Sequence, residues 1–460
     1  MTGQLAPSPR TAPAAEPREP DRVLGGHRRF LDALRPGTVG PRLSAALGAG
    51  SEEPCFVLDA KYEPGVRATV QYRLGDLLVR GDVLGVAAGV EAPGQEMTRH
   101  EAVVDDLGLA VSRFPHDPGI PTLPLALDAP RLLAELAEVG VAGAGDPRAV
   151  RLQLLRYRTG RRATFRVVVR ARDGRVRTFV AKCYHQPAKA SAVAAEAREA
   201  AVPARDADRL VLAPLVAHLP ALAVVLHEAL AGRSLGLGLP RAVVTGALSP
   251  SRDVARAAVA LAAFHALPPS SDRLRPPERE LAKFGARAYG ISLVDPAAGA
   301  ALAGLADRLA GLRPDTPPDR TGLVHGDCKP SQFLLRGADV ALLDLDSSGL
   351  ADPASDLGTF AASLRQLAVR RGLAERVPAR RNVARGWADR LAQTFLDTYV
   401  EAAGLSASAA GDLRHRTDWY EGVALERKAL RAFARSPLSP LPAALVDEAH
   451  RRLDATLGSS

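Results

Sequence analysis

The chain has 460 residues, of which 47% are hydrophobic and only 4% aromatic, so its core must be built mainly from Ala, Leu and Val. The formal charge of +9 suits anionic partners such as nucleotides. Arg residues are scattered among Asp and Glu, and no Lys/Arg run alternates with aromatic residues, so binding of nucleic acid is not favoured.

Cysteines and hydropathy indicate the compartment. Cys55, Cys183 and Cys328 are far apart, odd in number and fit no metal-binding spacing, which favours free thiols in a reducing environment. The N-terminal segment lacks the apolar stretch of a secretory signal, and no apolar run approaches the length of a membrane span. We therefore expect a cytoplasmic protein without a membrane partner.

The N-terminal region is predicted to begin with a tail. Residues 1–27 are rich in Pro, Ala and charge, a composition typical of disorder. The spacing of Phe30, Leu31 and Leu34 then predicts a helix, which Pro36 should end.

An internal repeat with an offset of 95 residues follows. Tyr62–Thr69 and Tyr157–Thr164 share Tyr, Gly, Arg, Ala and Thr at the same spacing, and each copy has the pattern of strand, turn and strand. Gly65 and Gly160 supply the backbone freedom of the turns. The repeat predicts a duplicated β-hairpin, with the first copy in an N-terminal cap over residues 28–130.

The second hairpin is extended into a small lobe. Strands are predicted at residues 150–157, 163–171, 177–184, 211–215 and 222–228, with one helix at 188–201. We therefore expect an antiparallel sheet with one helix over residues 131–230.

After Gly232 the pattern becomes helical. Helices fit residues 253–267, 296–312, 352–367, 383–404 and 413–435, with two short apolar stretches at 322–324 and 340–343. A small β lobe followed by a large helical lobe over residues 231–460 is a two-lobed α+β plan.

The densest chemical signal lies between residues 323 and 346. Asp327, Gln332 and Asp344 follow one another on predicted loops beside apolar strands. Phosphoryl transfer uses one carboxylate to orient the attacking hydroxyl, and a second carboxylate with an amide oxygen to hold Mg²⁺. The alternative, that these acids only cap turns, is less favoured.

This run resembles the catalytic segment of the aminoglycoside phosphotransferase and choline kinase superfamily, a branch of the protein-kinase-like fold. The resemblance implies that Asp327 is the catalytic Asp, that Asp344 binds the metal, and that His325 braces the loop. A later Asp-Pro-x-x-Asp stretch matches the family pattern in which Asp352 and Asp356 cap a helix and tie it to the catalytic loop.

One position departs from the family pattern. The metal-binding Asn of the family falls on Gln332, which has the same amide oxygen on an arm that is longer by one methylene. Gln332 could bind Mg²⁺ after a small backbone shift, but the change also raises the possibility of weak or altered catalysis.

The resemblance extends to the nucleotide site of the small lobe. Lys182, at the end of an apolar strand, looks like the Lys that contacts the nucleotide phosphates. Its partner should be an acid on the next helix, where Glu196 is favoured over Glu199.

Backbone groups should complete the nucleotide site. A Gly-rich loop of the protein-kinase type is missing, so the turn with Gly160 and Arg162 would cover the phosphates instead, although a plain hairpin turn fits equally well. The segment from Glu228 to Leu230 resembles the hinge that pairs with adenine.

The sequence thus predicts an ATP- and Mg²⁺-dependent phosphotransferase that acts on a hydroxyl of a small molecule: a sugar, amino sugar or aminoglycoside. An N-terminal cap also occurs in bacterial maltose kinases, which favours a sugar. Gln332 and the missing Gly-rich loop keep a catalytically weak, nucleotide-binding regulatory protein as the alternative. A protein kinase is disfavoured, because an Ala-Pro-Glu segment and a long activation loop are absent. The first hairpin should be a degenerate copy that packs on the small lobe and does not bind ATP.

Overall fold

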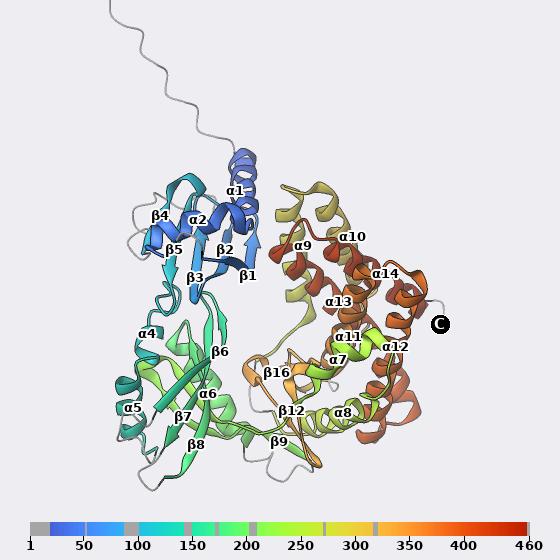
Figure 1. Cartoon of the computed structure of the whole chain (residues 1–460). Coiled ribbons are helices and arrows are strands. Elements are labelled where there is room, and N and C mark those ends of the chain that lie inside the picture. Colours follow the sequence, from blue (N-terminus) through green and yellow to red (C-terminus); the bar gives the residue numbers. More distant parts are fainter. Residues whose placement is uncertain are drawn as a thin grey trace, which may run out of the picture.

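The computed structural model describes residues 19–50, 53–86, 101–141, 150–170, 174–201, 209–269, 273–315 and 321–457. It confirms the two-lobed α+β plan with a preceding N-terminal part. Figure 1 shows the N-terminal sheet and the small-lobe sheet one above the other, with the large helical lobe facing both. Most of the predicted tail lies outside the described residues, but the first helix begins at Glu19, so the tail boundary at residue 27 was placed too late.

The N-terminal part, here called the cap, consists of two helices and a five-stranded antiparallel sheet. Its elements are α1 (Glu19–Ala33), α2 (Pro36–Leu47), β1 (Cys55–Glu63), β2 (Arg67–Leu74), β3 (Leu77–Val83), β4 (Ala102–Val104) and β5 (Leu109–Arg113), with strand order β1-β2-β3-β5-β4. Phe30 of α1 stacks on Tyr62 of β1 at 4.3 Å, and the hydroxyl of Tyr72 donates to the carbonyl of Ala33 at 2.8 Å. Pro36 opens α2, because proline fits the first position of a helix.

The predicted repeat is confirmed in the strand register. Tyr62 pairs with Ala68 across β1 and β2, and Tyr157 pairs with Ala163 across β6 (Val150–Arg158) and β7 (Arg162–Arg170). On the third strand the two copies diverge. Thr69 lies opposite Asp82, whereas Thr164 lies opposite Lys182.

The small lobe is a five-stranded antiparallel sheet of order β10-β11-β8-β7-β6. Its other elements are α4 (Leu123–Ala126), α5 (Ala129–Glu138), β8 (Val176–Tyr184), α6 (Pro187–Ala201), β10 (Leu215–Leu219) and β11 (Val224–Glu228). Ile120 and Leu123 belong to the same buried cluster as Phe165 and Phe179. The segment around α4 therefore packs with the small lobe, although the cap was predicted to extend to residue 130.

The large lobe is mostly helical. Its helices are α7 (Leu235–Thr245), α8 (Ser251–His265), α9 (Pro277–Ser292), α10 (Pro296–Gly311), α11 (Ala354–Ala374), α12 (Pro378–Ala402), α13 (Ala407–Arg435) and α14 (Leu441–Leu457). Its strands are β12 (Arg233–Ser234), β13 (Gly322–Val324), β14 (Phe333–Arg336), β15 (Asp339–Leu342) and β16 (Gly349–Ala351). Short 3-10 helices lie at Asp105–Leu107, Pro220–Leu222, Pro330–Gln332 and Leu345–Ser347. Phe360 and Phe395 stack at 3.7 Å between α11 and α12, and the buried Trp387 of α12 belongs to the same apolar cluster.

One strand joins the lobes in an unexpected way. β9 (Leu210–Leu212) pairs in parallel with β15 of the large lobe, whereas a small-lobe strand was expected at residues 211–215. The division into cap, small lobe and large lobe is our proposal, because a connecting segment such as β9 contacts elements outside the part to which it was assigned.

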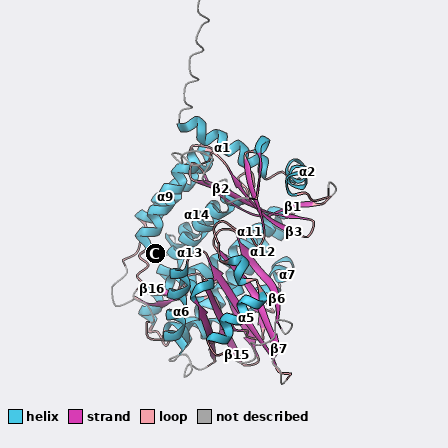
Figure 2. Cartoon of the chain, turned by 90° about the vertical axis from the view of Figure 1, so that its left-hand side faces the viewer, coloured by secondary structure: helices cyan, strands magenta, loops and turns pink. Residues whose placement is uncertain are grey.

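The cap contacts both lobes, and not only the small lobe as predicted. β1 packs against α13, and the buried apolar cluster continues from the cap into the large lobe. Asp59 of β1 pairs with Arg435 of α13 at 2.9 Å. On the other side, Lys61 donates to the carbonyl of Thr159 in the small-lobe hairpin. Figure 2 shows the two sheets one above the other, with the large-lobe helices behind them.

Two further properties bear on the sequence predictions. Cys55, Cys183 and Cys328 are all unpaired, and the last two are buried. Among the described helices, none is both long enough and apolar enough to cross a membrane.

Candidate active site

The loop after β13 carries Asp327, and a buried acid fixes its backbone. The carboxylate of Asp356, on α11, accepts the N–H groups of His325 at 2.6 Å and Gly326 at 2.9 Å, and lies 3.1 Å from Nε2 of His265. Burial would raise the pKa of Asp356, but the contacts from His265 and His325 hold it below its ordinary value. Asp356 therefore stays ionised and anchors the loop to α11.

His325 links the two segments that carry the acids. Its Nε2 lies 2.8 Å from the carbonyl oxygen of Leu343, the residue before Asp344, and its Nδ1 lies 3.2 Å from the N–H of Asp327. Because a carbonyl can only accept, Nε2 carries the proton and Nδ1 accepts. The ring thus holds the Asp327 and Asp344 segments in a fixed relation.

Gly326 is required by the shape of this loop. Its φ of 72° lies in the left-handed region, and a Cβ atom at this position would come within 2.3 Å of the carbonyl oxygen of Ser347. A side chain would therefore displace the loop that positions Asp327.

Asp352 has a related structural position at the start of α11. One carboxylate oxygen accepts the N–H of Ala354 at 2.9 Å, and the other accepts Nε of Arg416 at 2.7 Å. The side chain thus caps the helix that carries Asp356 and ties it to α13.

Asp327 is held in the ionised state by nearby cations. Burial raises the pKa of its carboxyl, but the charge and hydrogen bond of Lys329 outweigh burial, and Arg431 adds to the effect. The net pKa lies below the ordinary value. A carboxylate in this state can accept a hydrogen bond, and then a proton, from an attacking hydroxyl.

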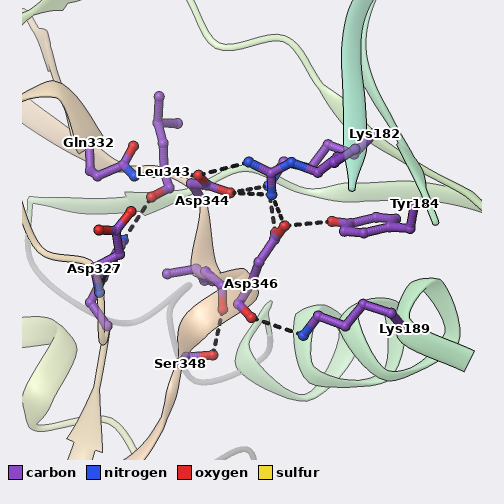
Figure 3. A network of polar contacts seen from close by, with 12 residues as sticks. Lys182, Tyr184, Lys189, Asp327, Gln332, Leu343, Asp344, Asp346 and Ser348 are labelled. Carbon is purple, nitrogen blue, oxygen red and sulfur yellow. Dashed lines mark hydrogen bonds and ion pairs between the residues drawn. The ribbon is translucent and has the colours of Figure 1, made fainter. Parts of the chain in front are cut away.

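A second acidic centre joins the two lobes (Figure 3). Nζ of Lys182 lies 2.7 Å from Asp344 and 2.6 Å from Asp346. Arg162 donates to the same two acids, and its two terminal nitrogens lie 3.0 and 3.2 Å from the two carboxylate oxygens of Asp344. The hydroxyl of Tyr184 donates to Asp346 at 2.8 Å. Burial raises the pKa of Asp344, but Lys182 and Arg162 hold it well below its usual range.

Asp344 has an unusual backbone and an amide neighbour. Its φ of 64° is uncommon for a residue with a side chain, and such conformations gather at functional sites. The buried Gln332 donates from Nε2 to Asp344 at 3.4 Å. The structure thus brings together the two residues that were predicted to bind the metal.

The predicted ion pair between Lys182 and Glu196 is not formed. Lys182 lies between Asp344 and Asp346. Glu196 instead accepts a hydrogen bond of 3.4 Å from Ser348 and interacts electrostatically with Lys189. Burial raises the pKa of Glu196, which is half-buried, while Glu199 is exposed. Glu196 therefore borders the site without contacting the lysine.

The hairpin turn at Gly160 is fixed by an acid that sequence reasoning missed. Asp117 accepts the N–H of Gly160 and the hydroxyl of Tyr157, both at 2.7 Å, and pairs with Arg80 of the cap. Arg162 extends from the same turn to the two aspartates of the large lobe. Asp117 thus fixes the backbone of the turn, and the turn directs Arg162 toward Asp344 and Asp346.

The predicted hinge lies at the end of β11. The N–H of Glu228 donates to Pro214 at 2.9 Å, and the N–H of Ala229 donates to Thr178 at 3.0 Å. Both N–H groups already donate to carbonyl oxygens of the small lobe, so adenine would have to pair with other backbone groups between Glu228 and Leu230.

Several site residues were missed by sequence reasoning, although some of them gave a signal. Asp346 follows Asp344 by two residues, and Tyr184 follows Lys182 by two on β8, so strand alternation places Tyr184 on the same face. Lys189 of α6 donates to the carbonyl of Asp346 at 3.0 Å (Figure 3). Its role could not have been read from local sequence.

The donor atoms around Asp344 fit a magnesium ion. Asp344 and Asp346 offer carboxylate oxygens, which are the ligands that hard cations prefer, and Gln332 would add an amide oxygen after rotation of its amide, whose nitrogen now faces Asp344. Within the described part of the chain, no three His, Cys, Asp or Glu side chains form a complete metal cluster. Mg²⁺ sites commonly combine one or two carboxylates with substrate phosphates.

Comparison with solved structures finds weak similarity to several kinases. A choline kinase from Cryptosporidium parvum Iowa II is 9% identical with a TM-score of 0.49, and the match covers 68% of this chain and 92% of that chain. A glucosamine kinase is 19% identical with a TM-score of 0.46, covering 88% and 94%. An aminoglycoside phosphotransferase from Streptomyces rimosus is 18% identical with a TM-score of 0.34, covering 63% and 97%. These values are too low to transfer a substrate.

Sequence comparison is more decisive. No curated protein matches the chain. The profile described as "Phosphotransferase enzyme family" matches residues 158–392, which is just over half of the chain. The match begins at the turn of the second hairpin and includes Lys182, the loop with Asp327, and Asp344 and Asp346. The chain belongs to this phosphotransferase enzyme family.

Proposed function

We propose that the chain transfers the γ-phosphoryl group of ATP to a hydroxyl of a small molecule. One observation carries the proposal: Lys182 and Arg162 of the small lobe converge on Asp344 and Asp346 of the large lobe. Asp327 lies on the neighbouring loop, linked to the same segment through the imidazole of His325 and the carbonyl before Asp344. Phosphoryl transfer needs cations for phosphate, oxygen ligands for a metal and a carboxylate for the acceptor, in this arrangement.

Asp327 would act on the acceptor. Its low pKa means that it orients the hydroxyl more than it removes a proton early, which suits a loose transition state. Asp344, Asp346 and Gln332 would hold Mg²⁺, which would neutralise charge on the phosphates when bound. Lys182 and Arg162 would contact phosphate oxygens from the small-lobe side.

For the acceptor we propose a class of compounds and not a single compound. A sugar, an amino sugar or an aminoglycoside fits the predicted chemistry. The cap would supply a wall for such a molecule if it binds in the cavity of about 480 Å³ that is lined by Asp59 and Gln71 of the cap, Arg156 and Tyr157 of the small lobe, and Arg435 of α13.

A catalytically weak, nucleotide-binding regulatory protein is the second candidate. The observation that favours it is the amide of Gln332, which turns its nitrogen to Asp344. For metal binding the amide would have to rotate by half a turn and present its oxygen.

A screen of purified full-length chain decides between the two. ATP consumption is measured with sugars, amino sugars and aminoglycosides, and Mg²⁺-dependent ATP binding is measured in parallel by calorimetry. Turnover with any acceptor supports the kinase, binding without turnover supports the regulatory protein, and the absence of Mg²⁺-dependent binding contradicts both.

A further inference from the structure

The wall of the site beyond Asp327 is strongly basic. Arg427, Lys428, Arg431 and Arg435 lie within nine residues of α13, and the three arginines follow one another at intervals of four. Residues four apart share one face of a helix, so the arginines form a row along α13. We call these four residues the α13 basic stripe.

The stripe runs from the catalytic loop to the cap. Arg431 is close enough to Asp327 for each charge to affect the pKa of the other. Arg435, one turn further on, pairs with Asp59 of the cap at 2.9 Å. The row thus connects the proposed catalytic carboxylate with the cavity between cap and small lobe.

Not every cation of the stripe is neutralised. Arg427 is held by Glu280, with one bond of 2.8 Å. Lys428 donates only to neutral groups, Ser363 at 3.1 Å and Gln366 at 3.5 Å. Among the described residues, Arg431 has no hydrogen-bond or ion-pair partner, and it remains accessible to solvent. Two cations on this wall therefore have no carboxylate in direct contact, although the charge of Asp327 acts on both.

Keeping the partly buried Lys428 charged without an acidic partner is unfavourable. Burial lowers the pKa of Lys428 to about 7, and neighbouring arginines act in the same direction. Arg431, whose side chain is exposed, adds a further positive charge beside Lys428, and Asp327 is the acid that attracts both. A bound anion would relieve this repulsion and restore charge balance.

The adjoining cavity has the size of a small-molecule site. Its volume of about 480 Å³ lies in the usual range of ligand pockets. Gln71, Arg156 and Arg435 add polar groups to its lining. Of the stripe, Arg435 lines this cavity, and Arg431 lies one helical turn closer to Asp327. An acceptor that extends from the cavity along the stripe could therefore place an anionic group on Arg431 and a hydroxyl toward Asp327.

We propose that the acceptor is a hydroxyl compound that carries an anionic group, a phosphate or a carboxylate, bound by Arg431 and Lys428. This proposal rests on the proposed function. In the reaction the acceptor oxygen bonds to the γ-phosphorus of ATP, the bond from that phosphorus to the bridging oxygen breaks, ADP leaves, and Asp327 takes the hydroxyl proton. Amino sugars and aminoglycosides, which are cations, are disfavoured by like-charge repulsion from the stripe.

Binding of inorganic phosphate tests the stripe without any assumption about the acceptor scaffold. The full-length chain is first saturated with Mg²⁺ and a non-hydrolysable ATP analogue, so that the nucleotide phosphate site is filled, and phosphate binding is then measured by calorimetry. Wild-type protein should bind phosphate, and Arg431→Gln should weaken this binding by about 10-fold or more, the usual size of a lost charge-assisted contact. Arg414→Gln is the matched control, because Arg414 lies on the same helix but pairs with Asp397 at 2.7 Å.

Turnover assays then identify the source of the anion. Glucose 6-phosphate, glucuronate, glucose and glucosamine are compared as acceptors, and Arg431→Gln should raise KM for the anionic acceptors while KM for ATP stays unchanged. A preference for glucose 6-phosphate indicates a phosphate and a preference for glucuronate a carboxylate. The proposal is overturned if phosphate does not bind, if Arg431→Gln and Arg414→Gln behave alike, or if Arg431→Gln raises KM for ATP. Loss of Mg²⁺-dependent nucleotide binding would instead contradict the proposed function.

Discussion

At the residue scale, a substitution of Asp327 should slow the chemical step while leaving nucleotide affinity nearly unchanged. Its carboxylate contacts Lys329, whereas the carboxylates that contact Lys182 and Arg162 belong to Asp344 and Asp346 in the next segment. We expect Asp327→Asn to lower kcat by about 10²–10⁴-fold, the range for loss of a general base, and to change ATP affinity by less than about 3-fold, because few contacts with the nucleotide side are lost. Coupled assays and calorimetry measure the two quantities. Asp339→Asn, at an exposed acid of the same lobe, is the control; a rate near that of wild type would exclude Asp327 from catalysis.

Asp344 should decide the magnesium dependence of binding. In Asp344→Ala, Lys182 and Arg162 keep Asp346 but lose one carboxylate, so they stay available for phosphate while a metal ligand is missing. We expect ATP to bind about equally well with and without Mg²⁺ in this variant, whereas Mg²⁺ should strengthen binding in the wild type. Titrations with and without chelator measure the ratio. If Mg²⁺ strengthens binding equally in both proteins, Asp344 does not hold the metal.

At the element scale, the helices show what apolar spacing can and cannot predict. Helices α8, α10, α11, α12 and α13 were located from their spacing, although most extend beyond the predicted ends. α7, α9 and α14 were missed. In α7, Gly236, Gly238 and Pro240 are poor helix formers, and the helix depends on packing against neighbouring elements. β9 was assigned to the wrong sheet, since its pairing with β15 is set by residues about 130 positions away.

The residues of the candidate site show the same difference between local patterns, which could be predicted, and long-range contacts, which could not. Asp327, Gln332 and Asp344 lie within 18 residues of one another, so their spacing could be read as a motif. The contact of Lys182 with Asp344 spans 162 positions and that of Asp117 with Gly160 spans 43. Such contacts are made by tertiary packing and leave no pattern in a local window.

The long helix α13 also carries a buried acid that should make stability depend on pH. Glu426 is fully buried, and among the described residues neither of its carboxylate oxygens has a hydrogen-bond partner. Burial raises its pKa from 4.5 to about 8, with Glu280 and Asp307 adding repulsion. In the unfolded chain the group would lose its proton near its ordinary pKa. The folded state therefore holds more protons between these two values, and its stability falls as pH rises through this window.

Replacing this acid should remove the pH effect. Glu426→Gln stays neutral, so we expect its free energy of unfolding to exceed that of the wild type by about 3 kcal/mol at about pH 7, since a tenfold difference in proton affinity corresponds to about 1.4 kcal/mol. Near pH 5 the difference should shrink toward zero. Thermal unfolding at both values measures it, with Glu401→Gln on the exposed surface of α12 as control. A difference that does not change with pH would contradict the buried, protonated state.

At the scale of the whole molecule, the two hairpins differ in the chemistry of the third strand. The cap has Asp82 where the small lobe has Lys182, and Thr69 donates to that acid at 2.7 Å. An acid repels phosphate, so we expect ATP to bind only at the small lobe. Lys182→Ala should weaken ATP binding by about 10-fold or more, whereas Arg67→Ala in the cap turn should leave it unchanged. The opposite pattern in equilibrium binding would place the nucleotide at the cap.

The connection between cap and small lobe converges on Asp117. This buried carboxylate pairs with Arg80 of the cap and accepts hydrogen bonds from Tyr157 and Gly160 of the second hairpin. Removing one member of a buried ion pair leaves the other charge uncompensated, which typically costs about 3–5 kcal/mol. Because Gly160 begins the turn that leads to Arg162, Asp117 couples the position of the cap to the phosphate side of the site.

Asp117→Ala should therefore lower stability and nucleotide affinity together. We expect a loss of about 3–5 kcal/mol in the free energy of unfolding, and a weaker affinity for Mg²⁺·ATP because the turn loses its anchor. Asp106→Ala is the matched control, since Asp106 pairs with Arg42 on the exposed cap surface, where an ion pair contributes less than about 1 kcal/mol. Thermal unfolding and calorimetry of both variants give the two quantities. If Asp117→Ala is destabilised but binds Mg²⁺·ATP as the wild type does, the anchor holds the cap without positioning the turn, and the cap has no influence on the nucleotide site.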